Sequence, residues 1–76
     1  MKRERVDSTT VRSIGYDPRR RELDVEFLES GVVYRYLEVP AEEHTAFMAA
    51  DSKGTYLNTV FKPKGYRYFI LTPKRW

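Results

Sequence analysis

Residues that could carry acid–base, nucleophilic or metal chemistry are few in this chain of 76 residues. The single histidine, His44, has neither a cysteine nor a second histidine with which to hold zinc. Asp24 and Glu26 come closest to a carboxylate pair, but they alternate with apolar residues and are typical of a solvated strand face. The serines have no identifiable partner base, and no glycine-rich phosphate loop is present. We therefore expect a protein that is not an enzyme and uses no metal or cofactor.

Basic and aromatic residues concentrate in the last third of the chain. Residues 1–51 contain eight Lys and Arg against eleven Asp and Glu, whereas residues 52–76 contain six basic residues and no acid. The same last segment holds six of the eleven aromatic residues. A cationic segment interleaved with rings is typical of a nucleic-acid contact surface. The alternative is a solvated basic tail beside ordinary core aromatics.

The length predicts one small domain, with its core between about residues 6 and 71 and flexible basic ends. The chain contains no cysteine, which is typical of proteins from a reducing compartment. It also lacks an apolar run that resembles a signal sequence or a membrane span. We expect a soluble, cytoplasmic protein that does not associate with membranes.

Three strands are predicted from the alternation of apolar and polar residues over 11–16, 22–28 and 32–39. Because short links join antiparallel neighbours, these strands should form a three-stranded meander. Two short helices follow. Pro40 suits the first position of one helix, and Ser52 can cap the other. Residues 66–71 are predicted to form a late short strand or an ordered tail, so the fold class is α+β.

The stretch Tyr34-Arg35-Tyr36 in the third strand has two interpretations. The rings can stack on nucleic-acid bases beside a cation, or they can pack over the core with their hydroxyls at its rim. An even loop in the second hairpin puts the rings on the core face and Arg35 near Asp24 and Glu26 on the exposed face. This register favours packing. The predicted core is Leu23, Val25, Phe27, Tyr34, Tyr36, Phe47, Leu57, Val60 and Phe61, with His44 packed beside it.

The order of these motifs resembles the KTSC domain, a family named for the C-terminal extension of lysyl-tRNA synthetase. The resemblance extends from about Val6 to Tyr68, and Leu57 departs mildly from the phenylalanine common in the family. The matching segments are Ile14-Gly15-Tyr16-Asp17, Leu23 to Phe27, Gly31 to Tyr36, Val39-Pro40 and Ala50 to Asn58.

What the resemblance implies about function is limited to RNA or general nucleic-acid binding, which is suggested by the proteins in which the family occurs. It carries over no catalytic residue. The positions that match its motif, in a structural or functional role, are Tyr34, Tyr36, Ser52, Gly54 and Asn58.

Two functions are consistent with these observations. The first is binding of RNA or DNA, with RNA favoured over DNA, through the basic and aromatic last third of the chain. The second is a protein-interaction or homodimerisation module that uses edge strands and surplus aromatics. The candidate nucleic-acid contacts are Arg19, Arg20, Arg21, Lys53, Asn58, Lys62, Lys64, Tyr66, Arg67 and Trp76.

Overall fold

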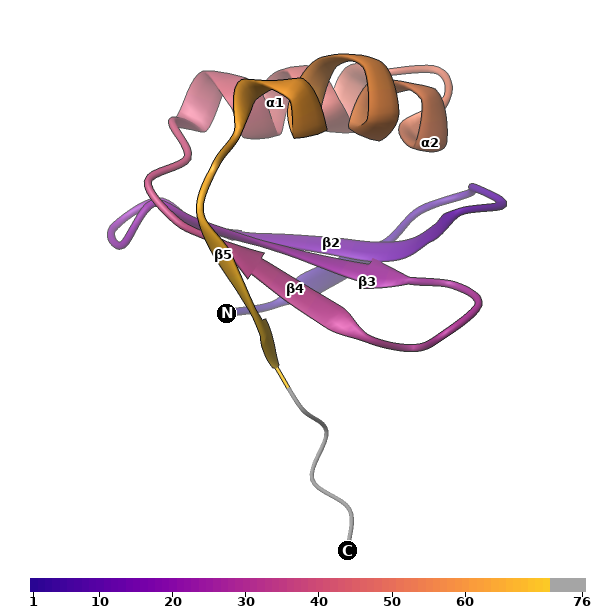
Figure 1. The fold of residues 1–76 in the computed structure, drawn as a ribbon, viewed down its shortest axis with the longest axis horizontal. Helices are drawn as coiled ribbons and strands as arrows, with labels where there is room; N and C mark the ends of the chain where they lie inside the picture. The colour runs from indigo at the N-terminus through magenta and orange to yellow at the C-terminus, as the bar shows by residue number, and fades with distance from the viewer. Residues whose placement is uncertain (72–76) are drawn as a thin grey trace, which may run out of the picture.

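The computed structural model describes residues 1–71 of the chain. One antiparallel sheet forms a layer, and the helices form a second layer over one of its faces (Figure 1). The strands lie in the sheet in chain order: β1 (Arg3–Arg5), β2 (Val11–Asp17), β3 (Glu22–Phe27), β4 (Val33–Tyr36) and β5 (Tyr68–Leu71). The helical layer consists of α1 (Ala41–Ala49), α2 (Lys53–Tyr56), the π-helical turn η1 (Leu57–Phe61) and the 3₁₀ turn η2 (Lys62–Lys64).

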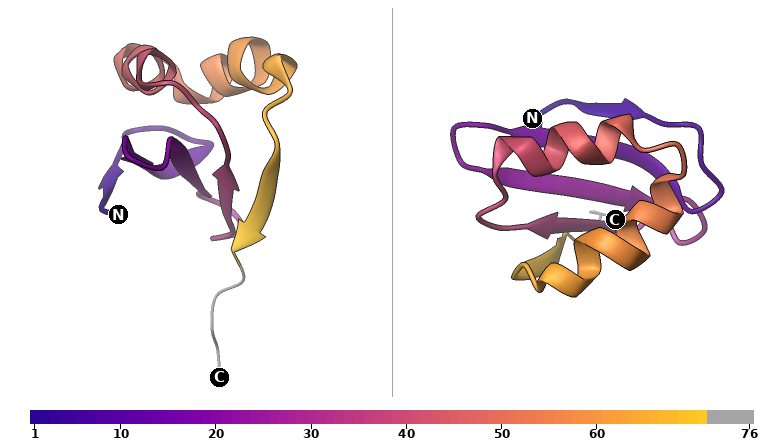
Figure 2. Two further views of the ribbon diagram at one scale, coloured as in Figure 1. Left: turned by 90° about the vertical axis from the view of Figure 1, so that its left-hand side faces the viewer. Right: turned by 90° about the horizontal axis from the view of Figure 1, so that it is seen from above.

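The predicted α+β class is confirmed. The predicted number of strands, three with a possible late fourth, is too low, because the sheet has five. The sequence pattern misses β1 because its three residues are all charged and show no apolar alternation. β1 nevertheless pairs with β2, where Arg3 lies opposite Gly15. The late strand is β5, and it pairs with β4 across the whole helical insertion. Seen from above in Figure 2, α1 lies toward the β1 side of the sheet. The second helical segment, which consists of α2, η1 and η2, lies toward the β5 side.

The predicted even register between the second and third strands of the meander is confirmed. Leu23 lies opposite Tyr36 and Val25 lies opposite Tyr34, so these side chains share one face of the sheet. Tyr36 is only 4% exposed and belongs to the core, whereas Tyr34 is partly buried and packs against it. The two rings therefore pack beneath the helices, as the alternation predicts.

The buried core draws on both layers. Phe27 and Tyr34 were expected in it and lie at its margin, partly buried. His44 packs as predicted, with its ring stacked on that of Tyr16 at a centroid distance of 4.8 Å. The buried apolar residues are Val11, Ile14, Leu23, Val25, Tyr36, Val39, Phe47, Leu57 and Phe61.

Val60 does not belong to this core, so that part of the prediction is wrong. A helical period of 3.6 places Val60 on the same face as Leu57 and Phe61. In the structure this segment forms a π-helical turn, in which the backbone N–H of Lys62 donates to the carbonyl of Leu57. The wider turn advances by a smaller angle per residue. Leu57 and Phe61 therefore stay on the buried face, and Val60 rotates away from it.

The helices begin close to the predicted residues. Pro40 is the N-cap of α1 rather than its first residue. Ser52 caps α2, since its Oγ accepts a hydrogen bond from the backbone N–H of Thr55 at 3.2 Å. Gly65 follows η2 with a φ of 73°, a left-handed conformation that turns the chain toward β5. Within residues 1–71, no helix is long and apolar enough to cross a membrane.

Candidate nucleic-acid interface

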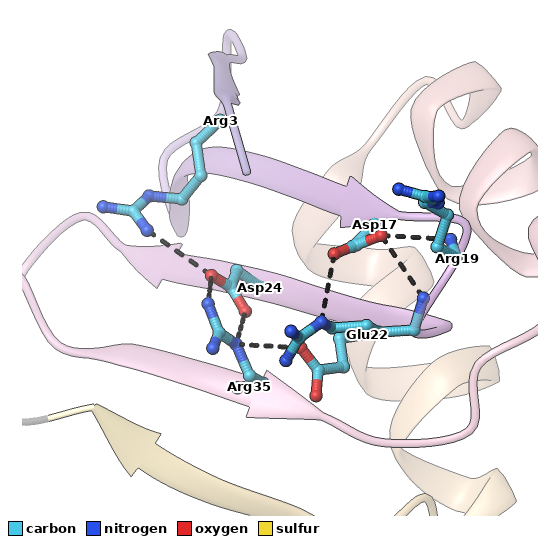
Figure 3. Close-up of polar contacts among 7 residues, drawn as sticks. Arg3, Asp17, Arg19, Glu22, Asp24 and Arg35 are labelled. Atoms are coloured by element: carbon cyan, nitrogen blue, oxygen red, sulfur yellow. Dashed lines mark hydrogen bonds and ion pairs between the residues drawn. The ribbon is translucent and has the colours of Figure 1, made fainter.

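Asp24 lies on the sheet face opposite the helices, yet it is fully buried. Arg35 on β4 donates two hydrogen bonds to its carboxylate, at 2.8 Å to Oδ1 and 2.9 Å to Oδ2 (Figure 3). Arg3 on β1 approaches Oδ2 at 3.5 Å. The hydrogen bond to Asp24 raises the pKa of the Arg35 guanidinium. This bidentate geometry is the strong form of the arginine–carboxylate pair.

The expectation that this strand face is solvated is therefore wrong at Asp24. Its neighbour on β2 is Gly15, which has no side chain. A Cβ at Gly15 would lie 2.7 Å from Cγ of Arg3, so the N-terminal segment sits directly against the sheet there. Glu26, two residues along β3, accepts a hydrogen bond from the hydroxyl of Ser13 at 2.7 Å. Both carboxylates are thus held by neighbouring strands, and their contacts stabilise the sheet.

Glu43 is a second buried carboxylate, 4% exposed, in the first turn of α1. The hydroxyls of Tyr56 and Tyr66 donate to it at 2.5 and 2.9 Å, and Nζ of Lys64 donates at 2.6 Å. Burial acts to raise the pKa of Glu43, but the hydrogen bonds from Lys64, Tyr56 and Tyr66 outweigh it and lower the pKa. This cluster joins α1 to α2 and to the segment that leads into β5.

An aromatic groove lies between the β4–β5 side of the sheet and the second helical segment. One part, of about 360 Å³, is lined by rings that include Tyr36, Tyr66 and Tyr68. The adjoining part, of about 580 Å³, is lined by residues that include Phe27 and Ile70. Two residues, Tyr34 and Lys62, line both parts. The rings of Tyr34 and Tyr68 stack with centroids 5.0 Å apart, and Tyr68 is 53% exposed.

A polar pocket of about 620 Å³ adjoins the aromatic groove. The two share Thr9 and Thr10 in their linings. A Cβ at Gly54 would lie 2.7 Å from Oγ1 of Thr10, so the glycine allows α2 to approach the loop before β2 closely. Residues that line the pocket include Thr9, Thr10, Ser52, Lys53, Gly54 and Asn58.

Both the sequence and the fold match known proteins. The family model described as the KTSC domain matches residues 7–69, most of the chain. The chain belongs to the KTSC family. The crystal structure of the KTSC domain protein YPO2434 from Yersinia pestis has the same fold, with a TM-score of 0.86 and 39% identity over 93% of this chain and 97% of that one.

Two further proteins are similar to most of this chain. An uncharacterized protein of Stutzerimonas stutzeri is 51% identical over 69 residues, which cover 91% of this chain and 96% of the relative. A protein of Tsukamurella paurometabola is 37% identical over 59 residues, which cover 78% of this chain and 87% of the relative. The aligned regions therefore cover most of the length of each relative.

The residues that match the KTSC motif fall into two groups. Tyr34 and Tyr36 lie on β4 beneath the helices, where both line the aromatic groove. Ser52, Gly54 and Asn58 line the polar pocket. Ser52 caps α2 and Gly54 permits its close approach, so each has a structural role in this KTSC domain. Asn58 is exposed, and its predicted contact with nucleic acid stays a prediction.

The lysines predicted to bind nucleic acid have different surroundings. Lys62 is exposed and lines the aromatic groove. Lys64 forms the ion pair with Glu43 described above. Nζ of Lys53 donates a hydrogen bond to the carbonyl of Ala50 at 2.5 Å, so it is held against the end of α1. Of the three, Lys62 is the one that faces the groove without such a contact within the described residues.

The predicted arginines lie at the end of the sheet where β2 turns into β3. Arg19, Arg20 and Arg21 are exposed there, and Asp17 accepts backbone hydrogen bonds from the first two at 3.0 and 3.3 Å. Arg67 is exposed directly before β5. None of these four arginines lines the aromatic groove or the polar pocket. Trp76 lies outside the described residues.

Sequence reasoning missed Tyr68 and Thr10 as groove residues and Glu43 as a buried carboxylate. The alternation of Tyr66, Tyr68 and Ile70 would have put these side chains on one face, but only pairing with β4 shows which face that is. No pattern in the sequence marks Thr10 as a groove residue. It lines the groove because the loop before β2 packs closely against α2.

Proposed function

We propose that this KTSC domain binds single-stranded nucleic acid, RNA in preference to DNA, in the aromatic groove. The observation that carries the proposal is the position of Lys62 and Tyr34 at the junction of the two parts of the groove. Proteins hold single strands by this combination, in which a cation tracks the backbone and aromatic rings stack on the bases.

Tyr68 is the ring best placed to stack on a base. It is 53% exposed and is supported from one side by the ring of Tyr34. Tyr36 does not suit this role, because it is buried and packs edge-on against Phe61 at a centroid distance of 4.7 Å. The two interpretations of Tyr34-Arg35-Tyr36, core packing and base stacking, therefore apply to different residues of β4. Tyr36 builds the core, and Tyr34 supports an exposed ring.

The charge available to a bound strand is modest. Residues 1–71 contain 12 of the 14 basic residues and all 11 acids, so Lys74 and Arg75 supply two of the three net positive charges. Within the described residues, Lys62 is the candidate lysine that lines the groove without an ion pair. With one phosphate neutralised, the salt slope for RNA is about −0.7, and affinity falls about threefold between 50 and 200 mM salt.

The preference for RNA rests on hydroxyl groups at the groove. Thr9, Thr10 and Ser30 line the part that also contains Phe27 and Ile70. Hydroxyls of this kind can donate to or accept from a ribose 2′-hydroxyl, which DNA lacks. Binding of an RNA strand should therefore exceed binding of the DNA strand of the same sequence.

Fluorescence anisotropy with a short labelled single strand tests the proposal. Tyr68→Ala should weaken binding by about 1–3 kcal/mol, the loss of one stacked base, while Tyr68→Phe should retain it. Lys62→Ser should reduce the magnitude of the salt slope by about 0.7. Lys2→Ser is the matched control, since Lys2 is also exposed but precedes β1 at the opposite edge of the sheet. It should leave the salt slope unchanged.

Two results would contradict the proposal. If Tyr68→Ala binds as tightly as the unmodified protein, the aromatic groove is not the site. If neither RNA nor DNA binds at low salt, the protein is not a nucleic-acid-binding module. The second result would favour the other role expected from the sequence, a protein-interaction or homodimerisation module.

A further inference from the structure

The two edges of the sheet differ in how they are protected. β1 forms one edge with Arg3–Arg5, and charged side chains on an edge strand discourage pairing with another chain. β5 forms the other edge, where Tyr68, Phe69 and Ile70 are 53%, 47% and 50% exposed. Among residues 1–71, no strand pairs with the outer side of β5. An exposed apolar edge of this kind is a template for another strand.

The backbone groups that β5 leaves free follow from its register. The backbone N–H of Leu37 donates to the carbonyl of Arg67 at 2.8 Å, so the backbone carbonyl of Arg67 points toward β4. In an antiparallel strand, the backbone N–H and C=O groups of alternate residues point toward the same neighbouring strand. The backbone groups of Phe69, which lies opposite Arg35, and of Leu71 therefore also point toward β4. The N–H and C=O groups of Tyr68 and Ile70 point the other way, toward the free edge of the sheet.

We propose that the free edge of β5 pairs antiparallel with β5 of a second copy of this chain. A two-fold axis perpendicular to the sheet passes between the two Phe69 residues. Tyr68 of each copy then lies opposite Ile70 of the other, and these pairs exchange main-chain hydrogen bonds through their free N–H and C=O groups. The two sheets become one continuous sheet, and the interface is closed by its own symmetry.

Charge and symmetry favour this partner over the other edge of the same protein. In the self-pairing register Arg67 lies opposite Leu71 of the second copy, so no like charges face each other. Pairing with β1 would place Arg3–Arg5 against the apolar residues of β5. It would also be head-to-tail, which builds open filaments instead of a closed dimer.

The interface is small, because each copy contributes one four-residue strand. It falls below the ~1,200 Å² of a standard stable interface, so the dimer should be weak and reversible. The pairing does not depend on nucleic-acid binding. It does involve Tyr68, which also lines the aromatic groove, and so it would bring two grooves close to each other across the axis.

Cysteine variants test the register directly, because the chain contains no cysteine of its own. Residues that face each other in a non-hydrogen-bonded pair have Cα atoms about 4.5 Å apart, a distance that a disulfide spans. Phe69→Cys should therefore form a covalent dimer under mild oxidation. Ile70→Cys should do so much more slowly, because its two copies are separated by more than about 7 Å. Equal rates for the two variants would overturn the proposed register.

A charge swap tests the same contact by sedimentation equilibrium. Phe69→Lys places like charges on the axis and should weaken self-association by about tenfold or more. An equal mixture of Phe69→Lys and Phe69→Glu should restore association as a heterodimer. Leu28→Lys, a change at an exposed apolar residue outside the strands, is the control and should have no effect. Circular dichroism checks that each variant is folded.

Two outcomes of this experiment would overturn the proposal. One is an unmodified protein that remains monomeric at millimolar concentration. The other is an oppositely charged mixture that associates no better than either variant alone. Because nucleic acid is absent throughout, neither outcome bears on the proposed function.

Discussion

Asp24 and Glu43 are both buried carboxylates, but they are neutralised in different ways. Asp24 receives two hydrogen bonds from one arginine on the adjacent strand, and a second arginine lies at 3.5 Å. Glu43 receives one hydrogen bond from each of three side chains that come from separate segments. Asp24 therefore depends on one partner within the sheet, whereas Glu43 distributes its charge over contacts that hold the helical layer together.

The largest expected effect comes from removing the principal partner of Asp24. Arg35→Ala leaves a fully buried carboxylate without its bidentate ion pair, which should cost about 3–5 kcal/mol of unfolding free energy. Urea unfolding measures this loss. The double variant Asp24→Leu with Arg35→Met replaces both charges by apolar groups and should recover most of the stability. A loss below about 1 kcal/mol for Arg35→Ala would show that Arg3 or water can replace the ion pair.

Removing Glu43 should have a smaller effect, because Lys64 is 49% exposed and can turn to water, and Tyr56 and Tyr66 are only partly buried. Glu43→Ala should cost about 1.5–3 kcal/mol, the range for hydrogen bonds to a charged group. Glu42→Ala is the matched control, since Glu42 is the exposed neighbour in the same helical turn, and it should change stability by less than about 0.5 kcal/mol. Equal effects of the two changes in urea unfolding would mean that the cluster around Glu43 does not stabilise the fold.

The pH dependence of stability should also report on Glu43. Its pKa in the folded protein lies below the ordinary value of 4.5, so its contribution is present above that pH and is lost as the pH falls through the folded pKa. Burial and the hydrogen bond to Glu43 raise the pKa of Tyr56 and of Tyr66 from 10.0 to about 12. That contribution is present below pH 10 and is lost as the pH rises through about 12.

Glu43→Gln separates these contributions in unfolding experiments across pH. The variant should lose the acid-dependent contribution of Glu43 and part of the alkaline one. The remaining alkaline dependence should come from the burial of Tyr56 and Tyr66, which the variant leaves in place, and from Tyr36, whose pKa burial raises to about 12 without contact to Glu43. An unchanged pH profile would contradict the assigned role of Glu43.

The smallest effects are expected from single outlying partners of each carboxylate. Tyr56→Phe removes one of three donors to Glu43 and should cost about 0.5–1.5 kcal/mol. Arg3→Ala removes the longer, partly exposed contact to Asp24 and should cost less than about 1 kcal/mol. If Arg3→Ala instead cost as much stability as Arg35→Ala, the Asp24 carboxylate would depend equally on both arginines. The contrast with Glu43, which has several partners, would then disappear.

These two sites also show how far the sequence could predict the structure. The alternation in the second and third strands correctly places Asp24 opposite Arg35. Its burial could not be predicted, because β1 has no apolar periodicity and only its pairing with β2 brings Arg3 to the carboxylate. For Glu43, the sequence indicates no more than an acid near the start of the first predicted helix, three residues after Pro40. Its donors, Tyr56, Lys64 and Tyr66, lie 13 to 23 residues away, beyond any local pattern.

The candidate groove could be predicted only in part, and the reasons are similar. Composition pointed to the last third of the chain, and Lys62 does line the groove. Composition could not show that Lys64 would be bound by Glu43, or that the π-helical turn would rotate Val60 out of the core. Such outcomes depend on contacts between layers, which no periodicity along one element records.

The position of β5 in the sheet has a consequence for how the molecule folds. β2, β3 and β4 are joined by short turns and can pair early, but β5 reaches β4 only after residues 37–67 have closed into a loop. Loop closure of this length carries an entropic cost that is met before the distant contacts form. We expect β5 to dock late, so Tyr68→Ala should speed unfolding while leaving the folding rate nearly unchanged. During synthesis, the aromatic groove would then be the last part of the protein to be completed.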